Sequence, residues 1–136
     1  MDGNDLYYGT LIVSVSSADA AIPIKDAAVA VRLVGEDGVK IFSVLVTNES
    51  GRTAPIEIPT PSPELSLLPS PEGRPYARVN VEVSAFGYFT TVNMNVPVFS
   101  GITSVQSVNM IAFPDNDRGA YIAPNVIVFD SGSELI

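Results

Sequence analysis

The stretch from Arg78 to Ala85 reads RVNVEVSA, and it decides the fold class. Valines alternate with polar residues along it, with Val79, Val81 and Val83 on one side and Asn80, Glu82 and Ser84 on the other. Because successive side chains of a strand point to opposite faces, this strand has one buried face and one face in water. Such a pattern is typical of an antiparallel sheet, and it places Glu82 on the exposed side.

Similar apolar or alternating segments recur along the chain, separated by turns rich in glycine, asparagine and aspartate. The expected strands span residues 11–16, 28–33, 39–47, 56–58, 78–85, 88–98 and 102–111. No window carries a helical stripe over three turns. The pattern predicts an all-β fold: a seven-stranded antiparallel Greek-key sandwich with a long Pro-rich loop and a C-terminal extension.

Two of these strands carry finer expectations. The strand over residues 39–47 is apolar on both faces around Phe42 and Val44, which favours a place near the centre of the sandwich. In the strand over residues 88–98, the side chains of Tyr88, Thr90, Val92, Met94 and Val96 share one phase. Phe89 has the opposite phase, and we expect it to be exposed on the outer face.

The chain has 136 residues, which fits one domain. We expect an N-terminal tail over residues 1–7, the sandwich over residues 8–111 and a C-terminal extension over residues 112–136. Residues 59–76 hold six prolines and form a long loop, either a stiff connection that caps the core or a docking loop for a partner. The extension ends in an apolar run that either folds back or contacts another chain: Val126, Ile127, Val128 and Phe129.

The composition excludes several classes of function. The net charge of −8, with seven lysines and arginines, argues against nucleic-acid binding. No apolar stretch is long enough to span a bilayer, and the acidic start is unlike a signal peptide, so we expect no membrane insertion. These features indicate a cytoplasmic location or export by a non-standard route.

Cysteine and histidine are both absent. Without them there is no thiolate nucleophile, no Ser-His-Asp triad and no general base with an ordinary pKa near neutrality. Carboxylates occur at Asp26, at Glu36-Asp37 and at residues 115–117, but the spacing fits solvated turns better than a calcium loop. We therefore expect no enzyme, no cofactor and no metal site.

Three stretches resemble the carboxypeptidase regulatory-like domains, relatives of the transthyretin and Cna-B sandwiches. The first is an opening strand over residues 9–15 followed by the entry to a second strand, Ile22-Pro23-Ile24-Lys25-Asp26-Ala27-Ala28-Val29. The other two are the turn Thr47-Asn48-Glu49-Ser50-Gly51 and the stretch Val81-Glu82-Val83-Ser84-Ala85-Phe86-Gly87-Tyr88. Residues 74–76 and 96–111 are similar to a subgroup in Firmicutes that accompanies peptidoglycan-binding and spore-cortex-lytic proteins. The resemblance implies a transthyretin-like fold and an accessory role.

The resemblance also implies two chemistries that the residues do not support. Transthyretin-like hydroxyisourate hydrolases use histidines and a Tyr-Arg-Gly-Ser ending, and this chain has neither. Cna-B domains form a Lys–Asn isopeptide bond beside a carboxylate; Glu82 matches that carboxylate, but no lysine lies in the first strand, and Lys25 sits in the following loop.

These observations favour a non-catalytic structural or protein-interaction module, accessory to a bacterial envelope or spore-associated assembly. A protein partner or self-association is expected. The alternative is a carbohydrate- or peptidoglycan-binding module, which needs exposed aromatic rings. The candidate contact residues are Tyr76, Phe89, Val126, Ile127, Val128 and Phe129.

Overall fold

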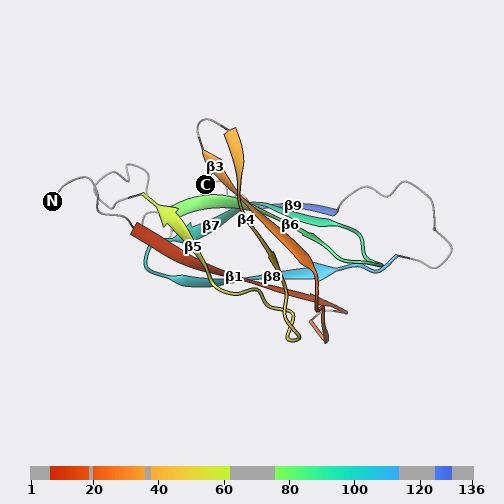
Figure 1. The fold of residues 1–136 in the computed structure, drawn as a ribbon. Coiled ribbons are helices and arrows are strands. Elements are labelled where there is room, and N and C mark those ends of the chain that lie inside the picture. Colours follow the sequence, from red (N-terminus) through yellow and green to blue (C-terminus); the bar gives the residue numbers. More distant parts are fainter. Residues whose placement is uncertain (1–6, 19, 36–37, 62–75, 114–124, 130–136) are drawn as a thin grey trace, which may run out of the picture.

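The computed structural model describes residues 7–18, 20–35, 38–61, 76–113 and 125–129, which form two β-sheets (Figure 1). Sheet A contains β1 (Tyr7–Ser17), β2 (Ile22–Pro23), β5 (Ile56–Thr60) and β8 (Thr103–Met110). Sheet B runs in the order β4 (Gly38–Val46), β3 (Ala28–Gly35), β6 (Tyr76–Ser84), β7 (Thr91–Phe99) and β9 (Asn125–Val128). The predicted all-β, two-sheet architecture is confirmed.

β1 is the centre of sheet A. Its first half pairs with β5 and its last two residues pair with β2, both antiparallel. β8 pairs with β1 in parallel over Thr10–Ser17. β8 pairs with β1 residues that also pair with β2 or β5. It therefore lies along one edge of β1, while β2 and β5 lie along the other edge.

The expectation of a purely antiparallel, seven-stranded sandwich is wrong in two respects. β1 and β8 are parallel, and so are β7 and β9. The chain passes from β7 to β8 through a turn at Ser100–Gly101 but changes sheet there, so β8 adds to β1 instead of pairing with β7. The described residues also hold two short strands beyond those expected, β2 and β9.

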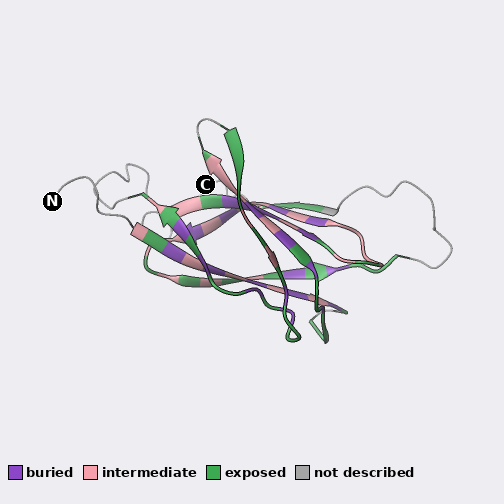
Figure 2. Cartoon of the chain, in the orientation of Figure 1, coloured by how far each residue is buried: buried purple, intermediate pink, exposed green. Residues whose placement is uncertain are grey.

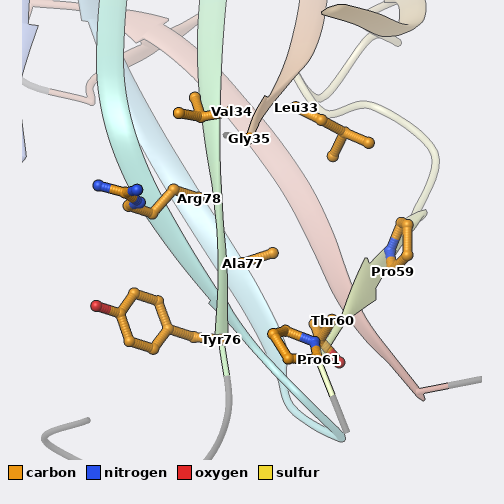
Figure 3. A pocket seen from close by; sticks show the side chains of 9 residues that line it. All are labelled: Leu33, Val34, Gly35, Pro59, Thr60, Pro61, Tyr76, Ala77 and Arg78. Atoms are coloured by element: carbon orange, nitrogen blue, oxygen red, sulfur yellow. The ribbon is translucent and has the colours of Figure 1, made fainter. Parts of the chain in front are cut away.

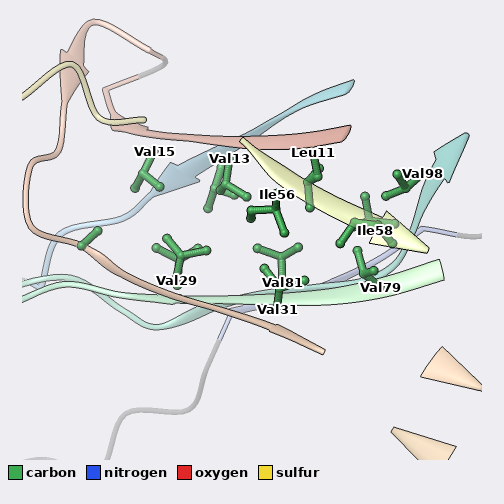
Figure 4. Packing of buried hydrophobic residues seen from close by; sticks show 14 of the residues in the cluster. Leu11, Val13, Val15, Val29, Val31, Ile56, Ile58, Val79, Val81 and Val98 are labelled. Atoms are coloured by element: carbon green, nitrogen blue, oxygen red, sulfur yellow. The ribbon is translucent and has the colours of Figure 1, made fainter. Parts of the chain in front are cut away.

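The core lies between the two sheets and is built mainly from valines (Figure 4). Val79, Val81 and Val83 of β6 are completely buried, as the alternation predicted. Figure 4 shows Val79 and Val81 on the side of the core opposite Leu11 and Val13 of β1. The other buried apolar side chains are Val15, Ile24, Ala27, Val29, Val31, Ile56, Ile58, Val96, Val98, Val108 and Met110. β-branched side chains suit this layer because their few rotamers lose little entropy in a pleated sheet.

The predicted phase of the sixth strand is wrong beyond its middle. Thr91 and Asn93 point inward, but so do Val96 and Val98, so the alternation changes phase between them. The cause is a bulge in the β6–β7 ladder: Val79 pairs with Val96 while Val81 pairs with Asn93, which leaves two β7 residues opposite Asn80. Val92 and Met94 therefore lie half-buried on the face opposite to Val96.

The predicted central position of residues 39–47 is also wrong. β4 is the edge strand of sheet B, and Figure 2 shows it exposed over most of its length. The strands of sheet A pack mainly over β6 and β7, and the β3–β4 hairpin projects from the body of the sandwich (Figure 1). A run that is apolar on both faces here belongs to a strand that sheet A does not cover.

The predicted domain limits stay a prediction, because residues 1–6, 62–75, 114–124 and 130–136 lie outside the described residues. Most of the Pro-rich loop (59–76) is among them. The structure does place part of the predicted extension: residues 125–128 form β9, which adds to the edge of β7.

Candidate interaction surface

β4 presents a row of large apolar side chains to solvent. Val39, Ile41, Val44 and Val46 are each at least 50% exposed, and Phe42 is 39% exposed. Exposed apolar residues scattered singly are common on soluble proteins, whereas five on one strand form a contiguous patch. We call these five residues the β4 strip.

The ladder with β3 places most of the strip on the outer face of sheet B. Val46 pairs with Ala28, Val44 with Ala30 and Ile41 with Arg32, and all three β3 residues point away from the core. Phe42 is the extra residue of a bulge, since Val31 pairs with Ser43 and Arg32 with Ile41. The outer face is therefore apolar at its β4 side.

One ion pair interrupts this face further in. The Arg32 guanidinium donates to the Glu82 carboxylate, with Nη1 and Oε1 2.8 Å apart. The pair joins β3 to β6 on the side away from the core, so the outer-face position predicted for Glu82 is confirmed. Lys25 lies elsewhere and pairs loosely with Glu49 at 3.8 Å, so the two residues tested for an isopeptide bond are each engaged with another partner.

The predicted contact residues of the C-terminal extension form the other edge of sheet B. Val126, Ile127 and Val128 are 40–58% exposed in β9. Phe129 is half-buried against the core, and its N–H donates to the carbonyl oxygen of Met94 at 2.7 Å. Of the two alternatives for this run, folding back onto its own sheet is the one observed, and it still leaves three apolar side chains in solvent.

Tyr76 is the first residue of β6, at one end of the sandwich, and is half-buried. Its ring packs against Phe99, with centroids 5.5 Å apart. A cleft of about 510 Å³ opens beside it between the ends of β3, β5 and β6 (Figure 3). Its described lining residues are Leu33, Val34, Gly35, Pro59, Thr60, Pro61, Tyr76, Ala77 and Arg78.

The polar groups of this cleft are few. Arg78 and Tyr76 lie on one side of β6, while Ala77 and the prolines lie on the other (Figure 3). The Thr60 hydroxyl is buried without a hydrogen-bond partner among the described residues. These groups can bond to a small polar ligand, but they are split across a strand and do not converge on one point.

The prediction that Phe89 is exposed is wrong, while its role as a partner contact stays a prediction. Its side chain is half-buried and meets the Phe113 ring edge-on, with centroids 5.2 Å apart. Its N–H donates to the carbonyl oxygen of Ile111, which ties the segment after the β6–β7 turn to the end of β8. Phe86, at the tip of the turn, has a fully exposed ring on which none of the described residues packs.

The described residues contain no group of three or more carboxylates, histidines or cysteines placed to hold a metal ion. Glu36, Asp37 and residues 115–117 lie outside the described part of the chain. Within that part, no helix is long and apolar enough to cross a membrane.

The contact residues expected from the sequence included neither the β4 strip nor Phe86. The sequence did carry a signal for the β4 strip. The run from Val39 to Val46 holds one charged residue, Lys40, and no proline, so it is apolar whatever its position in the sheet. The position of this strand at the edge of the sheet could not be inferred, because hydrophobic periodicity indicates which side chains share a face but not which strands lie side by side. For Phe86, the Phe-Gly pair within the turn was the available signal.

The sheets and their packing define a two-layer all-β protein. No protein-family model matches the chain, and no curated protein matches it in sequence. Among solved structures, it is similar to catechol 1,2-dioxygenase from Acinetobacter sp. ADP1, inhibited by bound mercury, with a TM-score of 0.53 and 16% identity. The similarity covers 94% of this chain and 60% of that chain, and at this identity it shows a shared fold.

This comparison corrects the expectation that the chain is not an enzyme, because the protein that shares its fold is an enzyme. The expectation rested on missing histidine, cysteine and signature residues. Those absences exclude particular mechanisms, such as a Ser-His-Asp triad, and they do not exclude catalysis on this sandwich.

Proposed function

We propose that the chain is a structural or protein-interaction module of the transthyretin-like, carboxypeptidase-regulatory type, accessory to a bacterial envelope or spore-associated assembly. The observation that carries the proposal is the β4 strip, five apolar side chains exposed along one edge strand. Natural edge strands are usually short, charged or covered, since an open apolar edge invites association. A module that functions in complex with a partner needs such an open edge for binding.

The family and the Greek-key topology within this proposal rest on the sequence motifs. Two of their glycines occupy turns that need them: Gly51 has a φ of 79° and Gly87 a φ of 88°. Gly51 also approaches the carbonyl oxygen of Val15 so closely that a Cβ would clash there. These constraints support the interpretation that the motifs encode turn geometry in a sandwich of this family.

Site-specific photo-crosslinking in the native cells tests the interaction role. A photoreactive residue at Val44 is compared with one at Val105, a valine that is 47% exposed on β8 at the edge of sheet A. We expect protein adducts from Val44 and few from Val105. Equal yields at the two positions, or none at Val44, would refute the interaction role of β4.

A carbohydrate- or peptidoglycan-binding module is the second candidate, and Phe86 is the observation that favours it. Its ring is fully exposed at the β6–β7 turn, near the Phe89–Phe113 pair, and exposed rings are the usual platforms for sugars. Pull-down on purified sacculi tests this candidate. Binding that falls with Phe86→Ala and persists with Val44→Asp would favour it over the interaction role.

A further inference from the structure

β4 has one open side. Among the described residues it pairs with β3 alone, so alternate N–H and C=O groups of its backbone point toward solvent. An edge of this kind can accept another strand through main-chain hydrogen bonds. The bulge at Phe42 interrupts the ladder with β3, which is regular from Ser43 to Val46. A partner strand therefore fits best along Ser43–Val46.

The edge of sheet A formed by β8 is different in character. Its exposed side chains are mainly polar, at Thr103, Ser107 and Asn109, with Val105 as the large apolar exception. Polar side chains along an edge leave little apolar area for a second strand to cover. Of these two edges, β4 is the one whose exposed side chains favour association.

We propose that β4 pairs in antiparallel orientation with the β4 of a second copy, about a twofold axis at Val44. The inference rests on the proposed interaction role and names its partner. In this register Val44 faces Val44 of the other copy, and Phe42 faces Val46 of the other copy. Val44 and Val46, which are 63% and 58% exposed, thereby gain apolar neighbours from the same strip, as a self-complementary twofold interface requires.

Charge favours this edge as the place where two copies meet. With a net charge of −8, two copies repel one another over most of their surface. β4 carries no carboxylate and a single cation, Lys40. An axis at Val44 places Lys40 just beyond the end of the other copy's β4, on the side of the turn that carries Glu49, whose side chain is 87% exposed and pairs loosely with Lys25. The twofold axis repeats this contact, so each acidic chain meets the other at its least acidic edge.

The area of the dimer interface limits the affinity of the two copies for each other. A pair of strands with one apolar row each lies at the low end of specific interfaces, at or below about 1,200 Å² in total. We therefore expect the dimer to dissociate in the micromolar range.

Disulfide trapping tests the proposal cleanly, because the chain has no cysteine of its own. Residues directly opposite in an antiparallel pair have Cα atoms about 4.5–5.5 Å apart, within disulfide range. Val44→Cys should therefore form a covalent dimer roughly tenfold or more faster than Val105→Cys, because pairing raises the effective concentration of the thiols. All variants are checked for unchanged far-UV circular dichroism, and their exposed positions make folding defects small.

The register is tested by two further variants. Phe42→Cys alone should not dimerise, since the two thiols are then four residues apart along the strand, about 13 Å. The double variant Phe42→Cys/Val46→Cys should dimerise. A Val44→Cys rate no higher than that of Val105→Cys, or rapid dimerisation of Phe42→Cys alone, would overturn the proposal. If Val44 crosslinks in cells only to a different protein, self-pairing fails while the interaction role stands.

Discussion

Thr47 donates its hydroxyl hydrogen to the carbonyl oxygen of Ile24, with the two oxygens 2.7 Å apart, and accepts the N–H of Ala27 at 2.9 Å. Through these two bonds one buried side chain holds the segment before β3 against the end of β4. Thr47 is also the first residue of the Thr-Asn-Glu-Ser-Gly stretch. Its hydroxyl satisfies backbone groups that have no strand partner there.

The same substitution should have opposite effects at two buried threonines. Thr47→Val removes both bonds and should lower the free energy of unfolding by about 2–4 kcal/mol. Thr91 is equally buried, but its hydroxyl has no partner among the described residues. Thr91→Val should therefore raise the free energy of unfolding by up to about 1 kcal/mol. Urea unfolding of both variants is the measurement, and equal losses at the two sites would contradict the assignment.

Two turn glycines share a positive φ but differ in their surroundings. A Cβ at Gly87 would meet no atom within 4 Å, whereas one at Gly51 would clash with the carbonyl oxygen of Val15. Gly87→Ala should lower the free energy of unfolding by only about 1 kcal/mol, because alanine disfavours the left-handed backbone conformation of this residue. Gly51→Ala should cost at least about twice as much, because the backbone must also move. Thermal unfolding of both variants compares them; a larger loss at Gly87 would show that the turns are misassigned.

Two valines of sheet B test which faces are buried. Val81→Asp places a carboxylate in a completely buried position and should destabilise the fold by about 4 kcal/mol or more. Val44→Asp changes a side chain that is 63% exposed and should alter the stability of the monomer by less than about 0.5 kcal/mol. Urea unfolding at low protein concentration gives both values. A tolerated Val81→Asp would mean that β6 faces the other way.

The sequence predicted the faces of β6 because strict alternation encodes which side chains share a side. Val79, Val81 and Val83 are buried, and Glu82 lies on the outer face with Arg32. The same rule failed along β7, because the bulge opposite Asn80 inserts a residue and reverses the phase. Asn95 takes a φ of 62° there, and its N–H donates to the Asn80 side chain at 2.9 Å, a contact between strands that no local pattern reports.

The position of β4 could not be predicted for a different reason. A run that is apolar on both faces suits a central strand covered on both sides, and it suits equally an edge strand that awaits a partner. Only the order of strands in sheet B and the cover given by sheet A distinguish the two cases, and both depend on contacts distant in sequence. The half-burial of Phe89 could not be predicted either, because its ring packs against Phe113, which belongs to a segment distant in sequence.

Sedimentation velocity across the micromolar range, on the wild-type chain and on the matched variants Val44→Asp and Val105→Asp, tests most directly the claim that β4 pairs with the β4 of a second copy. In the paired register Val44→Asp sets two carboxylates against each other, while Val105→Asp places the same charge on the edge of sheet A. We expect a concentration-dependent dimer for the wild type and for Val105→Asp, and a monomer for Val44→Asp. A wild-type chain that stays monomeric throughout, or a Val44→Asp variant that dimerises as well as the wild type, would contradict it.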